Sequence, residues 1–105
     1  MIKVIETKTQ GSHIEFSSPE LMWLGLSGQP YRGSLQIEMI SNGKSFDLLS
    51  LKKYITSLRS QVVILEDIAQ KILNDLDLLE NNTLSVSVRT TPRGGISSKI
   101  SAKKQ

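Results

Sequence analysis

The sequence contains no cysteine and only one histidine, His13. The absence of cysteine excludes disulfide scaffolds, thiolate zinc sites, iron–sulfur ligation and covalent thiol catalysis. A single histidine also excludes a multi-histidine metal site within one subunit, so we predict no metal. Aromatic residues make up only 5% of the chain, and we expect an aliphatic core. The sequence lacks both a bilayer-spanning apolar run and a secretory signal, so the expected location is the cytoplasm.

The chain has 105 residues, which predicts one domain. We place an N-terminal extension at 1–11, the domain at 12–100 and a basic tail at 101–105. Four of the 13 basic residues follow Pro92, where no acidic residue occurs. Two interpretations of this tail stay open. It is either a solvated terminus or a contact for nucleic acid or another polyanion.

Alternating polar and apolar residues predict four strands, at 12–17, 32–40, 84–89 and 96–100. Apolar residues three or four apart predict two helices, one beginning near Asp47 and continuing to Leu58, the other covering 65–79. Residues 18–30 lack a clean period of two, and we expect a long, functional connection there.

The resulting element order is strand, strand, helix, helix, strand, strand. It predicts an α+β fold in which a four-stranded antiparallel sheet carries both helices on one face. Such a sheet has two open edges on a small core, so we expect a homo-oligomer.

Four short motifs carry a resemblance to a known family. They are Ser27-Gly28-Gln29-Pro30, Ser50-Leu51-Lys52-Lys53-Tyr54, Leu65-Glu66-Asp67 and Thr91-Pro92-Arg93-Gly94-Gly95-Ile96. In this order and spacing they resemble the QueF family of nitrile reductases. The resemblance covers roughly residues 14–96. It implies the tunnelling fold, whose subunits close a shared oligomeric barrel and bind purine-like or pterin-like rings between them.

The QueF family reduces the nitrile of cyano-deazaguanine with NADPH, on the route to queuosine in transfer RNA. Its nucleophilic cysteine corresponds to Leu24, or to Gly25 if the alignment moves by one residue. Its proton-donating aspartate corresponds to Tyr31. Leucine has no lone pair with which to attack a nitrile, so we expect ordinary nitrile reduction to be absent.

The resemblance also implies a cofactor or phosphate site. The corresponding residues are Ser50, Lys52, Arg93 and Gly94. One lysine of the family's segment is Leu49 here, so whether NADPH binds is left open. The other interpretation of Arg93 is an exposed residue in a glycine turn.

The base-binding positions that the resemblance implies match the family more closely than the cofactor positions do. They are Glu66 with the adjacent Leu65, and Asp47 with the flanking Phe46 and Leu48. A carboxylate accepts two parallel N–H bonds from a guanine-like edge. The structural alternatives are that Glu66 complements a helix dipole, that Asp47 caps a helix, and that Phe46, like Trp23, packs in the core.

We therefore expect a non-reducing protein that binds a deazaguanine, purine or purine nucleotide at subunit interfaces. Two alternatives remain. One is an enzyme of deazaguanine or queuosine-type nucleoside modification with altered chemistry, in which Tyr31, Asp47 or Glu66 moves protons. The other is an accessory subunit of a paralogue that carries the cysteine.

Overall fold

The computed structural model describes residues 2–80, 82–92 and 94–104. Its elements follow the order expected from the sequence, with two short 3-10 helices added beside the α-helices. Their bounds are β1 Val4–Leu24, β2 Pro30–Phe46, α1 Leu48–Ser57, η1 Leu58–Ser60, η2 Leu65–Asp67, α2 Ile68–Leu76, β3 Thr83–Thr90 and β4 Lys99–Lys104.

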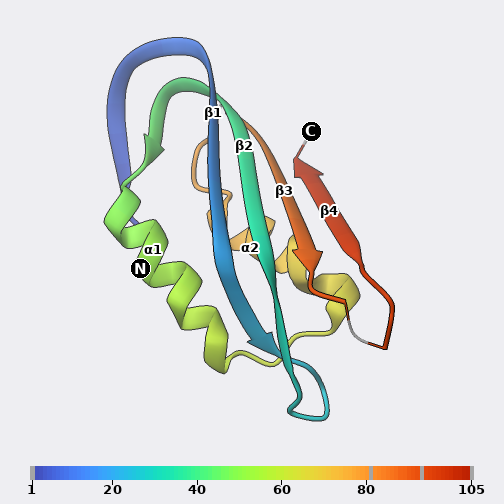
Figure 1. Ribbon diagram of the computed structural model, residues 1–105. Helices are drawn as coiled ribbons and strands as arrows, with labels where there is room; N and C mark the ends of the chain where they lie inside the picture. The colour runs from blue at the N-terminus through green and yellow to red at the C-terminus, as the bar shows by residue number, and fades with distance from the viewer. Residues whose placement is uncertain (1, 81, 93, 105) are drawn as a thin grey trace.

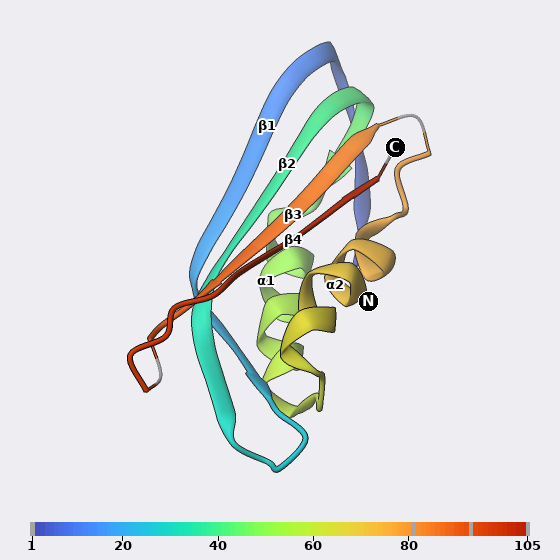
Figure 2. The ribbon, with the colours of Figure 1, turned by 90° about the vertical axis from the view of Figure 1, so that its right-hand side faces the viewer.

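The strands form one antiparallel sheet in the order β1-β2-β3-β4, so β1 and β4 are its edges (Figure 1). Figure 2 shows α1 and α2 on the same side of this sheet. The predicted four-stranded sheet with two helices on one face is therefore confirmed. The order is that of the tunnelling fold. Assembly into a barrel stays a prediction.

The core lies between the helices and one face of the sheet. On β2, Leu35, Ile37 and Met39 are buried, whereas Gln36 and Glu38 between them point to the other face. Every second residue of β3 is likewise buried, namely Leu84, Val86 and Val88. Burial on one face of a sheet produces this period of two.

The first two strands are longer than the sequence predicted. β1 begins at Val4, which pairs with Phe46, so residues assigned to an N-terminal extension belong to a strand. The expected long connection at 18–30 is wrong, because β1 continues to Leu24 and leaves a five-residue loop, 25–29. A register shift between Ser18 and Leu21 explains the missing alternation.

The last strand begins later than predicted. Its bounds are Lys99–Lys104 rather than 96–100, because Gly94 and Gly95, both with positive φ, make the turn that precedes it. Most of the predicted basic tail is thus paired with β3. Lys104 forms a 2.7 Å ion pair with Asp77 and is not a frayed terminal residue.

The second helix is also shorter than the predicted 65–79. It starts with the 3-10 turn η2 and ends at Leu76, although Leu79 beyond it remains buried. None of the helices in the described residues is long and apolar enough to cross a membrane.

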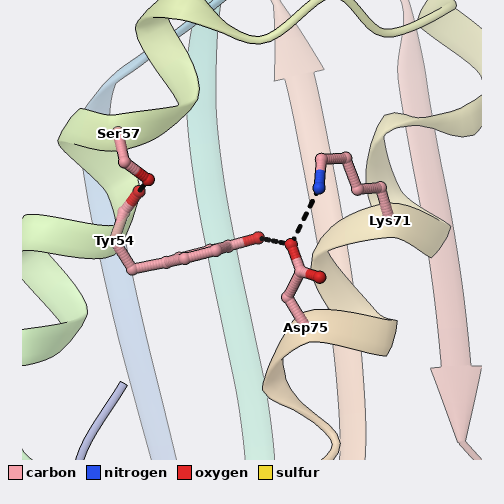
Figure 3. Close-up of polar contacts among 4 residues, drawn as sticks. All are labelled: Tyr54, Ser57, Lys71 and Asp75. Carbon is pink, nitrogen blue, oxygen red and sulfur yellow. Dashed lines mark hydrogen bonds and ion pairs between the residues drawn. The ribbon is translucent and has the colours of Figure 1, made fainter. Parts of the chain in front are cut away.

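A hydrogen-bonded tyrosine joins the two helices (Figure 3). The hydroxyl of Tyr54 on α1 donates to Asp75 Oδ2 on α2 over 2.6 Å, and Lys71 Nζ lies 3.0 Å from the same oxygen. Burial raises the pKa of Tyr54 well above its usual value, and the Asp75 carboxylate raises it further. The bond fixes α1 against α2 from within the Ser50–Tyr54 motif.

Replacing Tyr54 with Phe removes this bond and leaves Asp75 with its exposed partner only. We expect the free energy of unfolding at pH 7 to fall by about 1 to 2 kcal/mol in chemical denaturation. Lys71→Met is the matched control and should cost less than about 0.5 kcal/mol, since it breaks only a half-exposed i,i+4 pair.

The raised pKa also has a pH signature. The folded chain holds the Tyr54 proton more tightly than the unfolded chain, whose tyrosine pKa is about 10. The stabilisation is complete below that pH and is lost as the pH rises above it. The difference in stability between the wild type and Tyr54→Phe should therefore shrink above pH 10, and a constant difference would contradict the assignment.

Candidate functional site

A groove of about 600 Å³ lies between α1 and the strands β1 and β2. Its wall is mostly apolar, and it runs beside the edge strand β1. Two cations, Lys52 of α1 and Arg59 of η1, contribute to the lining together with Glu20 of β1. The apolar lining includes Phe16, Leu35, Ile37, Leu48, Leu51 and Ile55. Of the residues predicted to form the site, the groove brings together Leu48 and Lys52.

The start of α1, next to this groove, is held by a cap. The Asp47 carboxylate accepts a 3.0 Å hydrogen bond from the Ser50 amide, as an N-cap aspartate does. The Ser50 hydroxyl in turn donates to the Asp47 carbonyl and accepts from the Lys3 amide. The structural interpretation of Asp47 is therefore confirmed. A ligand role for it stays a prediction.

The two residues flanking this cap differ in exposure. Leu48 is 66% exposed, whereas Phe46 is 2% exposed and packs against Phe16 with ring centroids 6.5 Å apart. The buried position of Phe46 favours the packing interpretation over stacking on a ligand. Trp23 is fully buried, and the same interpretation applies to it.

Glu66 lies in η2, nine residues beyond the last residue of α1. The segment before it is pinned to the end of β1, because the Leu24 amide donates to the Gln61 carbonyl and the Val63 amide donates to the Leu24 carbonyl. Trp23 Nε1 also donates to the Val63 carbonyl. Glu66 is exposed and Leu65 half-buried on this fixed segment, so the Glu66 carboxylate faces solvent.

A side chain at Gly25, in the loop after Leu24, would displace the side chains that cover it. A Cβ built there would lie 2.8 Å from Gln29 Cδ and 2.8 Å from Tyr31 Cε2. Gln29 folds back over the loop and accepts from the Ser27 amide through its Oε1. Tyr31 stacks on Trp23 at 5.1 Å between ring centroids. The two positions that align with the family's nucleophile are thus a leucine and a glycine covered by neighbouring side chains.

The described residues predicted to hold NADPH lie on different parts of the sheet within one chain. Ser50 and Lys52 belong to α1 beside β1, whereas Gly94 lies in the turn between β3 and β4, at the opposite edge of the sheet. The Ser50 hydroxyl is already engaged in the cap. Arg93 lies outside the described residues, and a cofactor role for these four residues stays a prediction.

Comparison with known proteins agrees with these motifs. The sequence model of the family described as "QueF-like protein" matches residues 30–105. The chain belongs to the QueF-like family. It is 36% identical over 101 residues to the NADPH-dependent 7-cyano-7-deazaguanine reductase of Staphylococcus haemolyticus, a match covering 92% of this chain and 61% of that protein. The reductase of Staphylococcus aureus is 35% identical with the same coverage.

This QueF-like chain spans about three fifths of the length of the curated relatives it matches. The match shows its relation to deazaguanine reductases. Reduction of 7-cyano-7-deazaguanine is the activity of those relatives, and this chain lacks the cysteine on which the thiol chemistry implied by the family resemblance depends.

Sequence reasoning missed two parts of the site. It did not find the groove, to which Phe16 and Arg59 contribute from positions 43 residues apart. It also did not find that Gln29 covers Gly25. The seven-residue spacing of Lys52 on α1 and Arg59 on the following η1 was the available signal for a shared face.

The crowding at Gly25 predicts a measurable coupling. Gly25→Ala should lower the free energy of unfolding by about 1 to 3 kcal/mol, because its Cβ forces the covering side chains to move. The cost should be smaller in a Gln29→Ala background, with a coupling energy of at least about 0.5 kcal/mol.

Leu26→Ala is the matched control in the same loop. Its side chain is 74% exposed, so its substitution should change stability by no more than about 0.5 kcal/mol. Equal costs for Gly25→Ala with and without Gln29 would show that Gln29 does not fill this space. Chemical denaturation of Gly25→Ala, Gln29→Ala, the double variant and Leu26→Ala measures these changes in the free energy of unfolding.

Proposed function

We propose that this QueF-like protein binds a deazaguanine, purine or purine nucleotide at subunit interfaces without reducing it. Sequestration, delivery and regulation are the roles that such binding serves. The observation that carries the proposal is the retained, solvent-facing Glu66 on a fixed segment beside a nucleophile position that holds no cysteine. Base recognition needs the carboxylate, whereas reduction through a thioimide needs the thiol.

The position of Glu66 suits a receptor for a flat ring with adjacent N–H groups. Its carboxylate makes no ion pair within residues 2–80, 82–92 and 94–104. It lies in the first turn of η2, immediately before α2, where a carboxylate also complements the helix dipole. Two charge-assisted hydrogen bonds to a guanine-like edge would neutralise this charge.

A complete site requires a second subunit. Asp47 and Glu66 lie at opposite ends of α1, and a ten-residue helix is about 15 Å long. One chain therefore does not bring these two carboxylates to the same ligand. We propose that a neighbouring copy supplies the second half of the site, in a homo-oligomer.

The surface beside β1 supports this assembly. β1 and β4 are open strand edges, which a neighbouring copy pairs by continuing the sheet. The apolar groove lies next to the β1 edge, and Leu48 and Leu49 beside it are 66% and 60% exposed. Covering these side chains removes apolar surface from water.

The binding proposal predicts a ligand interaction that depends on Glu66. Calorimetric titration with guanine, 7-cyano-7-deazaguanine and purine nucleotides should detect binding by the wild type. Glu66→Ala should weaken it roughly 100-fold, because two charge-assisted hydrogen bonds are lost. Asp67→Ala is the matched control, a neighbouring exposed carboxylate in the same turn, and should change affinity less than threefold. Absence of binding across the panel would refute the proposal.

The non-reducing part of the proposal has its own assay. The protein mixed with NADPH and 7-cyano-7-deazaguanine should oxidise no NADPH above the rate without protein, because no cysteine is present to form the covalent intermediate. The Staphylococcus haemolyticus reductase serves as the positive control. Turnover by this chain would favour an enzyme with altered chemistry instead.

A further inference from the structure

Three exposed cations gather on the face of the sheet that the helices leave uncovered. Arg89 on β3 lies directly opposite Lys99 on β4, and Ser34 on β2 lies directly opposite Arg89. Arg32, two residues from Ser34 on the same face, is therefore a diagonal neighbour of Arg89, at about 7 to 8 Å between backbones. We call Arg32, Arg89 and Lys99 the cation cluster.

The cation cluster is unfavourable for the chain on its own. Like charges directly opposite each other on a sheet destabilise the pairing. Neither ion pair found among the described residues involves a member of the cluster, since these pairs join Lys71 to Asp75 and Lys104 to Asp77. The three charges are thus left without an acidic partner in that part of the chain, which is the condition under which an external anion binds.

The backbone beneath the cation cluster is tightly fixed. A Cβ at Gly33 would lie 2.0 Å from the Arg89 carbonyl oxygen, so β2 and β3 approach closely there only because residue 33 is glycine. The amide and hydroxyl of Thr91 both donate to the Arg32 carbonyl, over 2.9 and 3.3 Å. These contacts set the spacing of the cations before any ligand arrives.

The surroundings favour a compact anion over an extended one. Neighbouring strands lie about 4.8 Å apart, so the cation cluster is about 10 Å across three strands. Ser34 and Ser87 offer hydroxyl donors beside it. Farther along the same face, Glu38 pairs with Glu15 about 13 Å from Ser34. These two carboxylates repel an anionic chain that extends along the strands.

We propose that the cation cluster binds a diphosphate group. It is a second site, on the sheet face opposite the helices and η2, and it does not require the base-binding function of Glu66. Arginine forks and a lysine ammonium match the closely spaced oxygens of two linked phosphates. Inorganic pyrophosphate and the diphosphate of a nucleotide present the same chemistry.

Titration with inorganic pyrophosphate at 50 mM and 200 mM salt tests the proposal. The wild type should bind, more weakly at the higher salt, and Arg89→Gln/Lys99→Gln should lose at least tenfold in affinity. Lys103→Gln is the matched control. It removes one cation from the same face of β4, opposite Ser85 and away from the cluster, and should change affinity less than twofold.

Further measurements show whether the double variant is still folded and whether the ligand is free pyrophosphate or a nucleotide. The double variant should unfold at the same temperature as the wild type or higher, because it relieves repulsion between opposed cations. Titration with guanosine diphosphate beside pyrophosphate then distinguishes the sources. If a nucleotide is the ligand, guanosine diphosphate binds the wild type more tightly than pyrophosphate, and the double variant loses affinity for both.

Three results would overturn the proposal. They are no pyrophosphate binding at 50 mM salt, an equal loss in Lys103→Gln, and binding of duplex DNA that grows with its length while pyrophosphate fails to bind. The last result would make this face a nucleic-acid surface. Glu66→Ala should leave pyrophosphate binding intact, so failure of the purine site and failure of this site are told apart.

Discussion

Both helices cover the same face of the sheet, and most of the molecule's patterning depends on this one-sided cover. Each strand must present apolar side chains to the helices and polar ones to solvent, which gives β2 and β3 their strict alternation. The same constraint leaves a mostly polar face on the other side and two edge strands, β1 and β4. The apolar groove lies under one of those edges, and the cation cluster extends toward the other.

The sequence predicted the strands whose alternation of polar and apolar residues follows directly from having helices on one face only. The alternation at 32–40 and 84–89 and the aspartate before α1 reflect local physics, and all three are present in the structure. Prediction failed where tertiary pairing overrides local pattern. Residues 4–10 are largely polar and join β1 only because β2 extends beside them. The register shift near Pro19 interrupts the alternation of polar and apolar residues in the rest of that strand. The turn made by Gly94 and Gly95 makes β4 begin later in the sequence than the alternation predicted.

The residue types of the candidate site were predictable from the sequence, but which of these residues lie together in the folded chain was not. Motif positions identified Asp47, Glu66 and the helix between them, yet no spacing along the chain shows that the segment before Glu66 is bonded to Leu24. The contact of Leu24 with the segment at 61–63 joins residues nearly 40 positions apart and depends on the whole sheet. The groove arises in the same way, from strand and helix side chains that meet only after folding.

The covered glycine beside Leu24 bears on any attempt to introduce a thiol into this loop by substitution. A cysteine at Gly25 would place its Cβ 2.8 Å from Gln29 Cδ and 2.8 Å from Tyr31 Cε2, so at least one of these side chains must shift. A thiol introduced at this position is therefore accompanied by a rearrangement of the side chains that cover the loop.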